Sequence, residues 1–224
     1  MTRRLIVSSG SPSPRAVVLV LHGGQEHSFA PTKPHNLAVL RMLPLANTIG
    51  AAAEGVLAVA RLRFTTRGWN DDGAQPLADA LWALGELSSR FPELPIGVVG
   101  HSMGGRVALR VTNYPSVRAI IGLAPWIPPG EPITTGFGTS VMLIHGGRDR
   151  TTSAQASIER VETLRAAGMP AGFVLVNRDG HGMLRRPRVW HDLSASLLCA
   201  SLLPDQHVTG SAAALLAGTA AIKV

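Results

Sequence analysis

The apolar and polar residues of this chain are arranged in blocks that predict strands and helices in turn. Short, nearly continuous apolar runs occur at residues 16–22, 56–64, 96–99, 119–126, 141–145 and 172–176. Such runs are typical of strands buried on both faces of a parallel sheet. Between them, apolar residues recur at helical spacing at residues 37–53, 76–90, 106–113, 151–167 and 189–203. Residues 3–9 are expected to add an edge strand.

The alternation of strands and helices favours an α/β architecture. We predict a single doubly wound, mostly parallel sheet with helices on both faces, because parallel strands need crossover helices that then cover the sheet. A length of 224 residues suits one domain with a substantial core. We assign residues 1–203 to this domain. Residues 204–224 form a C-terminal tail rich in small residues, which we expect to be disordered or loosely docked.

The composition excludes several classes of protein. Hydrophobic residues make up 46% of the chain and charged residues 16%, as expected of a globular protein rather than a disordered one. No apolar run reaches the roughly 20 residues that span a bilayer. The apolar stretch 5–7 is too short for the core of a signal peptide, so we predict a cytoplasmic protein with no membrane partner. The single cysteine, Cys199, excludes an internal disulfide and a cysteine-based zinc site.

The formal net charge of +7 comes almost entirely from arginine. The arginines are scattered along the chain, and only 4% of the residues are aromatic, which disfavours a nucleic-acid partner. The densest group consists of Arg178, Arg185, Arg186 and Arg188. This pattern favours a solvated basic surface over a binding patch. The sequence leaves the oligomeric state open.

The strongest chemical signal is the segment 96–106, which reads IGVVGHSMGGR. An apolar run enters a Gly-x-Ser-x-Gly turn and an apolar helical segment follows, which is the layout of a nucleophile elbow. Ser102 is expected at the tip, in a strained backbone conformation. Gly100 and Gly104 remove side chains that would collide across so tight a turn. Glycine is common in this chain, so the flanking pattern carries more weight than the motif itself.

Polar residues follow three further apolar runs. His22-Gly-Gly-Gln25 follows the run 16–22, Asp149 follows the run 141–145, and His181 follows the run 172–176. In open parallel sheets the site lies at the carboxyl ends of the strands, where these segments and Ser102 meet. We therefore expect a site built from four distant parts of the chain.

Together, these segments resemble those of the α/β-hydrolase family, specifically a small lidless serine esterase-like bacterial member. The resemblance covers nearly the whole chain up to about residue 203. The order Ser102, Asp149, His181 is the family order. It implies that Ser102 is the nucleophile, that His181 is the general base and then the general acid, and that Asp149 orients the imidazole.

The resemblance also implies an oxyanion hole. The amide of Met103 is expected to supply one donor, and the amide of Gly24 the other, with Gln25 as the alternative to Gly24. The chain departs from many family members in having only the short segment 128–140 where they carry a lid. This predicts an exposed site with modest substrate selection. His-Gly-Gly-Gln also lacks the third consecutive glycine of the His-Gly-Gly-Gly esterases.

Each assignment has a competing interpretation. Ser102 can sit in a glycine-rich turn without chemistry, and Asp149 can cap the following helix, for which Thr151 and Thr152 are other candidate caps. The rival residues are Asp71, Asp72 and Asp179 for the carboxylate and His191 for the imidazole. We expect His22, His101 and His145 to brace their turns. Trp69 and Trp126 either line a substrate pocket or pack in the core.

The sequence thus predicts a serine hydrolase that cleaves a carboxylic ester or thioester of a small molecule through an acyl-enzyme, with no metal and no cofactor. Lactone opening of the dienelactone-hydrolase kind, or acyl transfer, is an alternative reaction. A non-catalytic ligand-binding domain of the same fold is an alternative of another class, because fold does not determine function. The acyl group and the alcohol or thiol stay open.

Overall fold

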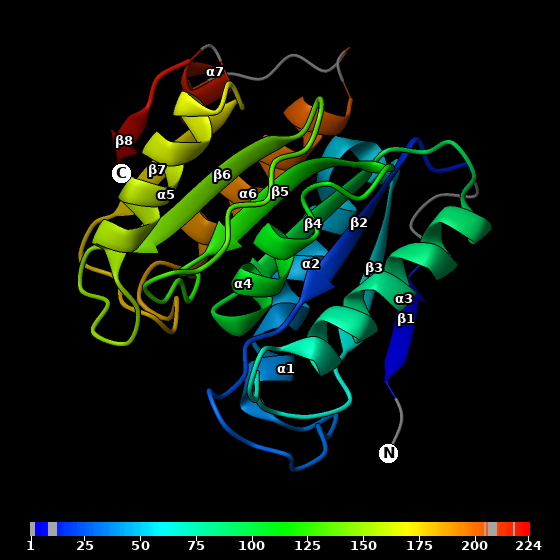
Figure 1. Ribbon diagram of the computed structural model, residues 1–224. Coiled ribbons are helices and arrows are strands. Elements are labelled where there is room, and N and C mark those ends of the chain that lie inside the picture. Colours follow the sequence, from blue (N-terminus) through cyan, green and yellow to red (C-terminus); the bar gives the residue numbers. More distant parts are fainter. Residues whose placement is uncertain (1–2, 9–12, 204, 206–209, 217) are drawn as a thin grey trace.

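The computed structural model describes residues 3–8, 13–203, 205, 210–216 and 218–224 (Figure 1). Its strands are β1 (Arg4–Ser8), β2 (Ala16–Leu21), β3 (Leu57–Arg63), β4 (Ile96–His101), β5 (Val117–Leu123), β6 (Ser140–Gly146), β7 (Ala171–Val176) and β8 (Ala221–Lys223). Its helices are α1 (Leu37–Leu40), α2 (Met42–Ala51), α3 (Ala74–Arg90), α4 (Met103–Arg110), α5 (Ala154–Ala166), α6 (Pro187–Leu202) and α7 (Gly210–Leu216), and a short 3₁₀ turn, η1, spans Ala52–Gly55.

All eight strands form one sheet in the order β1-β3-β2-β4-β5-β6-β7-β8. Only β1 is antiparallel to its neighbour, and the other pairings are parallel. The strand order reverses direction beside β2 and β4, which is the point where open α/β sheets place their ligands. The predicted fold class is therefore confirmed, including the edge strand near the N-terminus.

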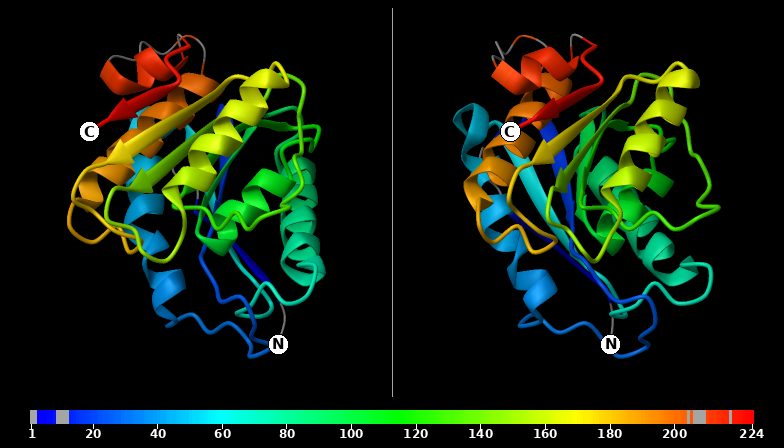
Figure 2. Two further views of the ribbon diagram at one scale, coloured as in Figure 1. Left: turned by 60° about the vertical axis from the view of Figure 1, so that its left-hand side comes forward. Right: turned by 90° about the vertical axis from the view of Figure 1, so that its left-hand side faces the viewer.

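Helices cover both faces of the sheet (Figure 2). Helices α2 and α6 lie on one face, and α3, α4 and α5 lie on the other. Strands β2 and β4 are buried along their whole length, as their unbroken apolar sequence predicts for strands packed on both sides. An apolar core lies between the sheet and the helices on each face. These two cores hold the central strands in fixed positions, so the loops at the carboxyl edge of the sheet start from rigid ends.

The segment 124–139, between β5 and β6, contains no helix or strand. Many α/β hydrolases carry a lid at this place. As predicted, this segment contains no lid. Its middle is tied to the helices beneath it, because Arg160 of α5 donates hydrogen bonds to the carbonyls of Glu131 and Pro132, both at 2.7 Å. No described helix is both long and apolar enough to cross a membrane.

The expectation of a disordered or loosely docked tail is wrong for the described residues beyond 203. Helix α7 packs against α6, and β8 pairs in parallel with β7 as the last strand of the sheet. Ala212 and Leu215 are buried in the core beside α6. Residues 204, 206–209 and 217 of the tail lie outside the described residues. Backbone pairing explains this order, because an edge strand gains its hydrogen bonds without a long apolar run.

Candidate active site

The turn after β4 places Ser102 above the carboxyl edge of the sheet. Its φ and ψ are 55° and −115°, a strained conformation for a residue with a side chain. A Cβ atom on Gly104 would lie 2.6 Å from the carbonyl oxygens of Leu21 and His22, so only glycine fits there. The Ser102 amide donates to the Leu123 carbonyl at 2.9 Å, which holds the strained turn against β5. The predicted elbow geometry is thus present.

The structure brings Ser102, His181 and Asp149 together. His181 Nε2 lies 3.0 Å from Ser102 Oγ, and His181 Nδ1 lies 2.9 Å from Asp149 Oδ2. A carboxylate only accepts hydrogen bonds, so Nδ1 carries the proton and Nε2 is left to accept the serine proton. The Asp149 carboxylate is completely buried, whereas 18% of the His181 side chain is exposed. The imidazole therefore sits at the mouth of the site with its orienting partner behind it.

Asp149 is ionised. Burial alone would raise its pKa, but hydrogen bonds from His145, His181 and the amides of Thr152 and Thr151 outweigh burial and lower the pKa far below its usual range. The two amides donate to Oδ1 at 3.0 and 2.7 Å. Asp149 therefore fixes its own loop and orients His181 with different oxygens. Neither Asp149 nor Thr151 caps α5, because the N-cap of that helix is Ser153, so the capping interpretation is wrong.

Thr152 is a site residue that the sequence analysis did not identify. Its hydroxyl oxygen lies 3.0 Å from Asp149 Oδ2, 3.2 Å from His181 Nδ1 and 3.2 Å from the Ala124 carbonyl. It does not cap α5, because the cap is Ser153, which accepts the Ala156 amide at 3.1 Å. The available signal was a hydroxyl placed shortly after the predicted aspartate, where a loop can turn it back on the carboxylate.

His145 reinforces the same carboxylate from inside β6. Its Nε2 lies 3.3 Å from Asp149 Oδ2, and its Nδ1 lies 3.0 Å from the Ser157 hydroxyl of α5. Its side chain is completely buried. Asp149 thus stands between two imidazoles, of which only that of His181 reaches Ser102.

Two further histidines hold the backbone around the site. His101 Nε2 donates to the carbonyl of His181 at 2.8 Å, and burial, followed by the nearby His181 charge, lowers the pKa of His101 to about 3. His22 Nδ1 donates to the Gly23 carbonyl at 2.7 Å while its Nε2 accepts the Phe64 amide at 3.2 Å. Burial lowers the pKa of His22 to about 4. Both rings are neutral at physiological pH and brace their turns as expected.

The loop after β2 lies against the start of α4. A Cβ atom on Gly24 would collide with the Met103 side chain and the Arg67 carbonyl, so the backbone of Gly24 approaches the elbow closely. The Gln25 amide donates to the Arg67 carbonyl at 2.8 Å and is therefore already used. Met103 is the first residue of α4, where amides have no partner within the helix. The pair Gly24 and Met103 stays a prediction, now without its Gln25 alternative.

The rival residues lie elsewhere. The Asp179 carboxylate accepts hydrogen bonds from the amides of Gly180, Arg185 and Arg186 and from the Trp190 indole. Burial opposes its ionisation, but these donors outweigh burial and lower its pKa. Asp72 accepts the Ala74 amide at the start of α3, and Asp71 lies beside it in a turn. His191 is in α6 and contacts neither Ser102 nor Asp149.

Trp69 and Trp126 enclose Arg106. The Arg106 guanidinium lies 3.7 Å from the Trp69 ring centroid and 4.4 Å from that of Trp126. It also forms an ion pair with Glu131 at 2.5 Å, and Arg110 reaches the same carboxylate at 2.5 Å. We call these residues the arginine–glutamate cluster. It joins α4 to the segment 124–139 and is a packing unit.

The two residues on either side of His181 in the chain, Gly180 and Gly182, line different concave surfaces, and a third pocket lies near Gly24. On the Gly182 side is an apolar groove of about 400 Å³, lined by Leu37, Leu40, Arg41, Pro44, Gly182, Met183, Leu184, Pro187 and His191. Leu37 also lines a pocket of about 300 Å³ that reaches Gly24. On the Gly180 side is an open hollow of about 720 Å³, lined by Gly147, Arg148, Asp149, Arg150, Gly180 and Arg185.

Comparison with known proteins gives matches in structure. No protein-family model and no curated protein sequence matches the chain. An esterase from the planctomycete Thermogutta terrifontis, in a butyrate-bound form, matches with a TM-score of 0.71 and 16% identity over 92% of each chain. A serine hydrolase homologue from Coxiella burnetii matches with a TM-score of 0.68 and 17% identity, over 86% of this chain and 90% of that one.

Est1E from Butyrivibrio proteoclasticus, with ferulic acid bound, matches with a TM-score of 0.64 and 13% identity, over 89% of this chain and 95% of that one. At these identities the likeness concerns the fold. The strand order of the sheet and the structural neighbours lead to the same conclusion. This chain has the α/β-hydrolase fold.

Proposed function

We propose that this protein is a serine hydrolase that cleaves a carboxylic ester or thioester of a small molecule through an acyl-enzyme. The observation that carries the proposal is the chain of contacts from Ser102 through His181 to Asp149, with distances of 3.0 and 2.9 Å. A serine hydroxyl is a weak nucleophile at neutral pH, and a base in direct hydrogen bond with it removes that limitation. The esterase neighbours support the same class of reaction.

Each residue has a defined task in this reaction. His181 Nε2 takes the proton as Ser102 Oγ attacks the carbonyl carbon, and Asp149 stabilises the imidazolium that forms. The tetrahedral intermediate collapses, the bond to the leaving alcohol or thiol breaks, and His181 returns the proton to the leaving group. Water then attacks the acyl-serine in the same way, with His181 again acting as base, and releases the acid.

The amides of Gly24 and Met103 are proposed to bind the oxyanion of both tetrahedral intermediates. Their contribution grows as negative charge develops on the carbonyl oxygen, and one such donor is worth about 2.7–4 kcal/mol of transition-state stabilisation. Thr152 is proposed to position Asp149 and His181, because its hydroxyl contacts both. It touches no reacting atom.

The proposal is tested with a fluorophosphonate probe and a short p-nitrophenyl ester. We expect the wild-type protein to be labelled at Ser102 and to hydrolyse the ester. Ser102→Ala should abolish labelling and lower kcat by about 10⁶-fold. Ser88→Ala, a control in α3 whose hydroxyl contacts Ser116, should behave as wild type. A folded wild-type protein that is neither labelled nor active would identify a ligand-binding domain instead.

A further inference from the structure

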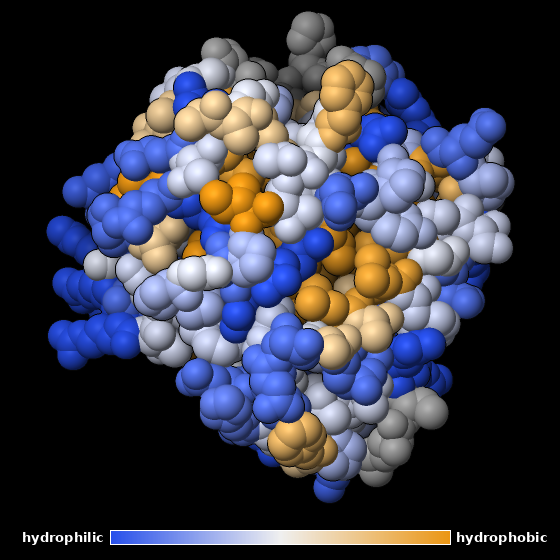
Figure 3. Space-filling view, viewed as in Figure 1, coloured by the Kyte–Doolittle hydropathy of each residue, from blue (hydrophilic) through white to orange (hydrophobic). Residues whose placement is uncertain are grey.

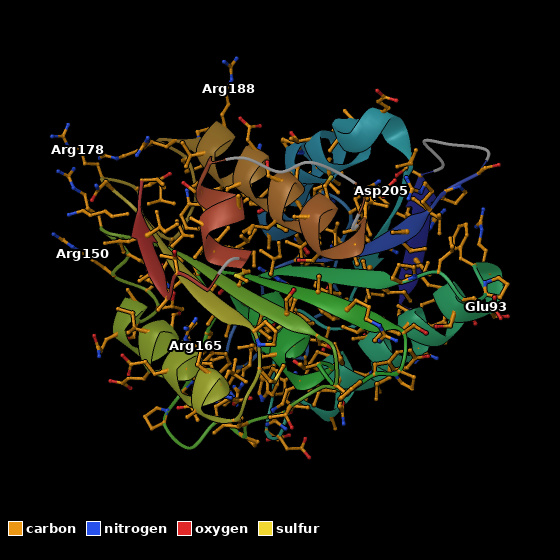
Figure 4. The ribbon with its side chains drawn as sticks, turned by 90° about the horizontal axis from the view of Figure 1, so that it is seen from above. Glu93, Arg150, Arg165, Arg178, Arg188 and Asp205 are labelled. Atoms are coloured by element: carbon orange, nitrogen blue, oxygen red, sulfur yellow. The ribbon has the colours of Figure 1, made fainter. Side chains whose placement is uncertain are left out.

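The loops that carry Asp149 and His181 also carry unpaired positive charge. Arg148 and Arg150 flank Asp149 after β6, and Arg178, Arg185 and Arg186 follow β7, with Arg188 at the start of α6. In Figure 4 the labelled Arg150 and Arg178 extend outward from the left-hand side of the molecule, and Arg188 extends upward. Figure 3 shows hydrophilic side chains projecting from the corresponding left-hand edge. The fold thus gathers charges that come from separate parts of the sequence.

Three of these arginines surround the hollow beside His181, which we call the basic hollow. Arg148 and Arg150 reach it from one loop, and Arg185 reaches it from the other. Its other lining residues are Gly147, Asp149 and Gly180, so its floor is largely backbone. Gly180 directly precedes His181, and Asp149 binds the imidazole. The basic hollow therefore borders the aspartate that contacts His181 and the residue that precedes His181, whereas Ser102 and His181 are not among its lining residues.

No carboxylate neutralises this charge within the described part of the chain. The exposed guanidinium groups of Arg148, Arg150 and Arg185 take part in no ion pair or hydrogen bond there. The two acidic residues of these loops point inward. Asp149 is bonded to His181 and the threonine amides, and Asp179 is bonded to its own loop and Trp190. Clustered like charges repel each other, and an anion bound among them removes that cost.

We propose that the basic hollow binds a phosphate-bearing portion of the substrate. Guanidinium groups match phosphate oxygens with paired hydrogen bonds, and several arginines around one concavity suit a multiply charged anion. The proposal rests on the proposed hydrolase function and names its substrate class, acyl esters or thioesters whose leaving group carries phosphate. The apolar groove on the Gly182 side of His181 then takes the acyl chain. His181 protonates the leaving group as the bond between the leaving group and the acyl carbon breaks.

The test compares two thioesters with one reacting centre. Butyryl-coenzyme A carries phosphate on its thiol part, and S-butyryl-N-acetylcysteamine carries none. We expect kcat/KM to be at least tenfold higher for the phosphate-bearing thioester. Raising NaCl from 50 to 500 mM should reduce this ratio, because salt screens exposed charges. Equal kcat/KM values, with no effect of salt on their ratio, would overturn the proposal while leaving the hydrolase function in place; no hydrolysis of either would overturn the function.

Matched variants locate the binding site. Arg148→Gln/Arg185→Gln removes one charge from each loop and should lower the ratio of the two kcat/KM values at least tenfold, mainly through KM for the phosphate-bearing thioester. Arg90→Gln/Arg118→Gln removes the same charge from the end of α3 and the start of β5, at the opposite edge of the sheet, and should leave the ratio within twofold. An equal loss in both pairs would indicate general electrostatic attraction and not a site.

A third thioester separates the leaving group from the acyl group. S-glutaryl-N-acetylcysteamine carries its negative charge on the acyl side. We expect it to be hydrolysed no faster than the butyryl compound, since the basic hollow is assigned to the leaving group. A gain for the glutaryl compound that Arg148→Gln/Arg185→Gln removes would contradict that assignment and place the acid in the basic hollow.

Discussion

Two buried polar clusters border helix α4, and they differ in what their hydrogen bonds leave free. At the start of α4, Ser102 is buried with 8% of its surface exposed, 18% of the His181 side chain is exposed, and His181 Nε2 faces the Ser102 hydroxyl. Further along the same helix, Arg106 is paired with Glu131 and enclosed by two tryptophan rings. Both clusters are charged and buried. In the first cluster an imidazole nitrogen faces the hydroxyl of Ser102, our proposed nucleophile, whereas in the second the charged groups face one another.

The comparison teaches that burial and charge do not by themselves identify a site. The arginine–glutamate cluster contains more formal charge than the triad, yet its charged groups pair with one another. In the triad the carboxylate is fully satisfied, the imidazole has one nitrogen facing a hydroxyl, and the backbone of that hydroxyl is strained. Ser102 has both a strained backbone and a hydroxyl that faces an imidazole nitrogen. The following predictions distinguish the effects of the two clusters on activity and on stability.

Among the variants that test this comparison, Asp149→Asn is expected to have the largest effect. The substitution keeps the shape of the side chain but offers a donor to His181 Nδ1, which favours the wrong tautomer of the imidazole. We expect kcat to fall by about 10⁴-fold with KM little changed. The ester assay measures this, and circular dichroism checks that the fold persists. Activity close to wild type would mean that another group orients His181.

Glu131→Gln should lower the stability of the protein and leave kcat nearly unchanged, the opposite of Asp149→Asn. It leaves Arg106 and Arg110 without their carboxylate, and breaking a buried ion pair costs about 3–5 kcal/mol of the free energy of unfolding. Because the arginine–glutamate cluster touches no reacting atom, kcat of the remaining folded protein should stay within a few-fold of wild type. Urea denaturation and active-site titration measure the two quantities.

The exposed Glu162 on α5 provides the matched control for this substitution. Glu162→Gln should change the free energy of unfolding by less than about 0.5 kcal/mol, as is usual for surface substitutions. If both glutamate variants were equally stable, the cluster would not be the structural unit that the geometry indicates.

Thr152→Val removes one hydroxyl from the triad and keeps the volume. We expect kcat to fall by at least about tenfold at constant KM, since a hydrogen bond to a charged group is worth about 1.5–3 kcal/mol. Thr152→Ser, which restores the hydroxyl, should recover most of the loss. A purely structural role predicts instead that both variants change stability and leave kcat of the folded protein unchanged.

A further prediction concerns stability at acid pH. Burial lowers the pKa of His22 to about 4 and that of His101 to about 3, whereas both titrate near 6.5 in the unfolded chain. Below pH 6.5 the unfolded state therefore binds protons that the folded state does not, so the free energy of unfolding falls as the pH is lowered. Each ring contributes up to about 1.4 kcal/mol per pH unit.

Urea denaturation between pH 4.5 and 7.5 measures this slope. That range lies above the ordinary pKa of aspartate, so the lowered pKa of Asp149 adds little to it. His22→Gln should reduce the slope by the contribution of one proton. A free energy of unfolding that did not vary with pH in wild type would contradict neutral, buried rings at both positions.

The predictable parts of this molecule are those set by neighbouring residues. The elbow follows from glycines at positions 100 and 104, whose absent side chains permit the turn around Ser102. Strands β2 and β6 follow from their apolar runs. Asp149 and His181 were predicted to lie near Ser102 because each follows such a run within five residues, and parallel strands end at the same edge of the sheet.

The unpredicted parts depend on distant segments that meet. Nothing near Thr152 indicates that its hydroxyl reaches the carbonyl of Ala124 and the ring of His181. The three-residue strand β8 is too short for any alternation of apolar and polar residues to be visible, and its order comes from pairing with β7. Trp69 is enclosed with Arg106 because a loop folds back over α4, which local sequence does not encode.

The sequence alone determined the class of fold and the positions of Ser102, Asp149 and His181 at the carboxyl ends of three strands, because these depend on side chains that act within one turn or one strand. The tertiary structure decided which hydroxyl supports the aspartate, which tryptophans enclose an arginine, and which arginines from two loops surround one hollow beside His181. Those outcomes depend on the packing of segments far apart in the chain, where the free energy comes from contacts that exist only once the sheet has formed.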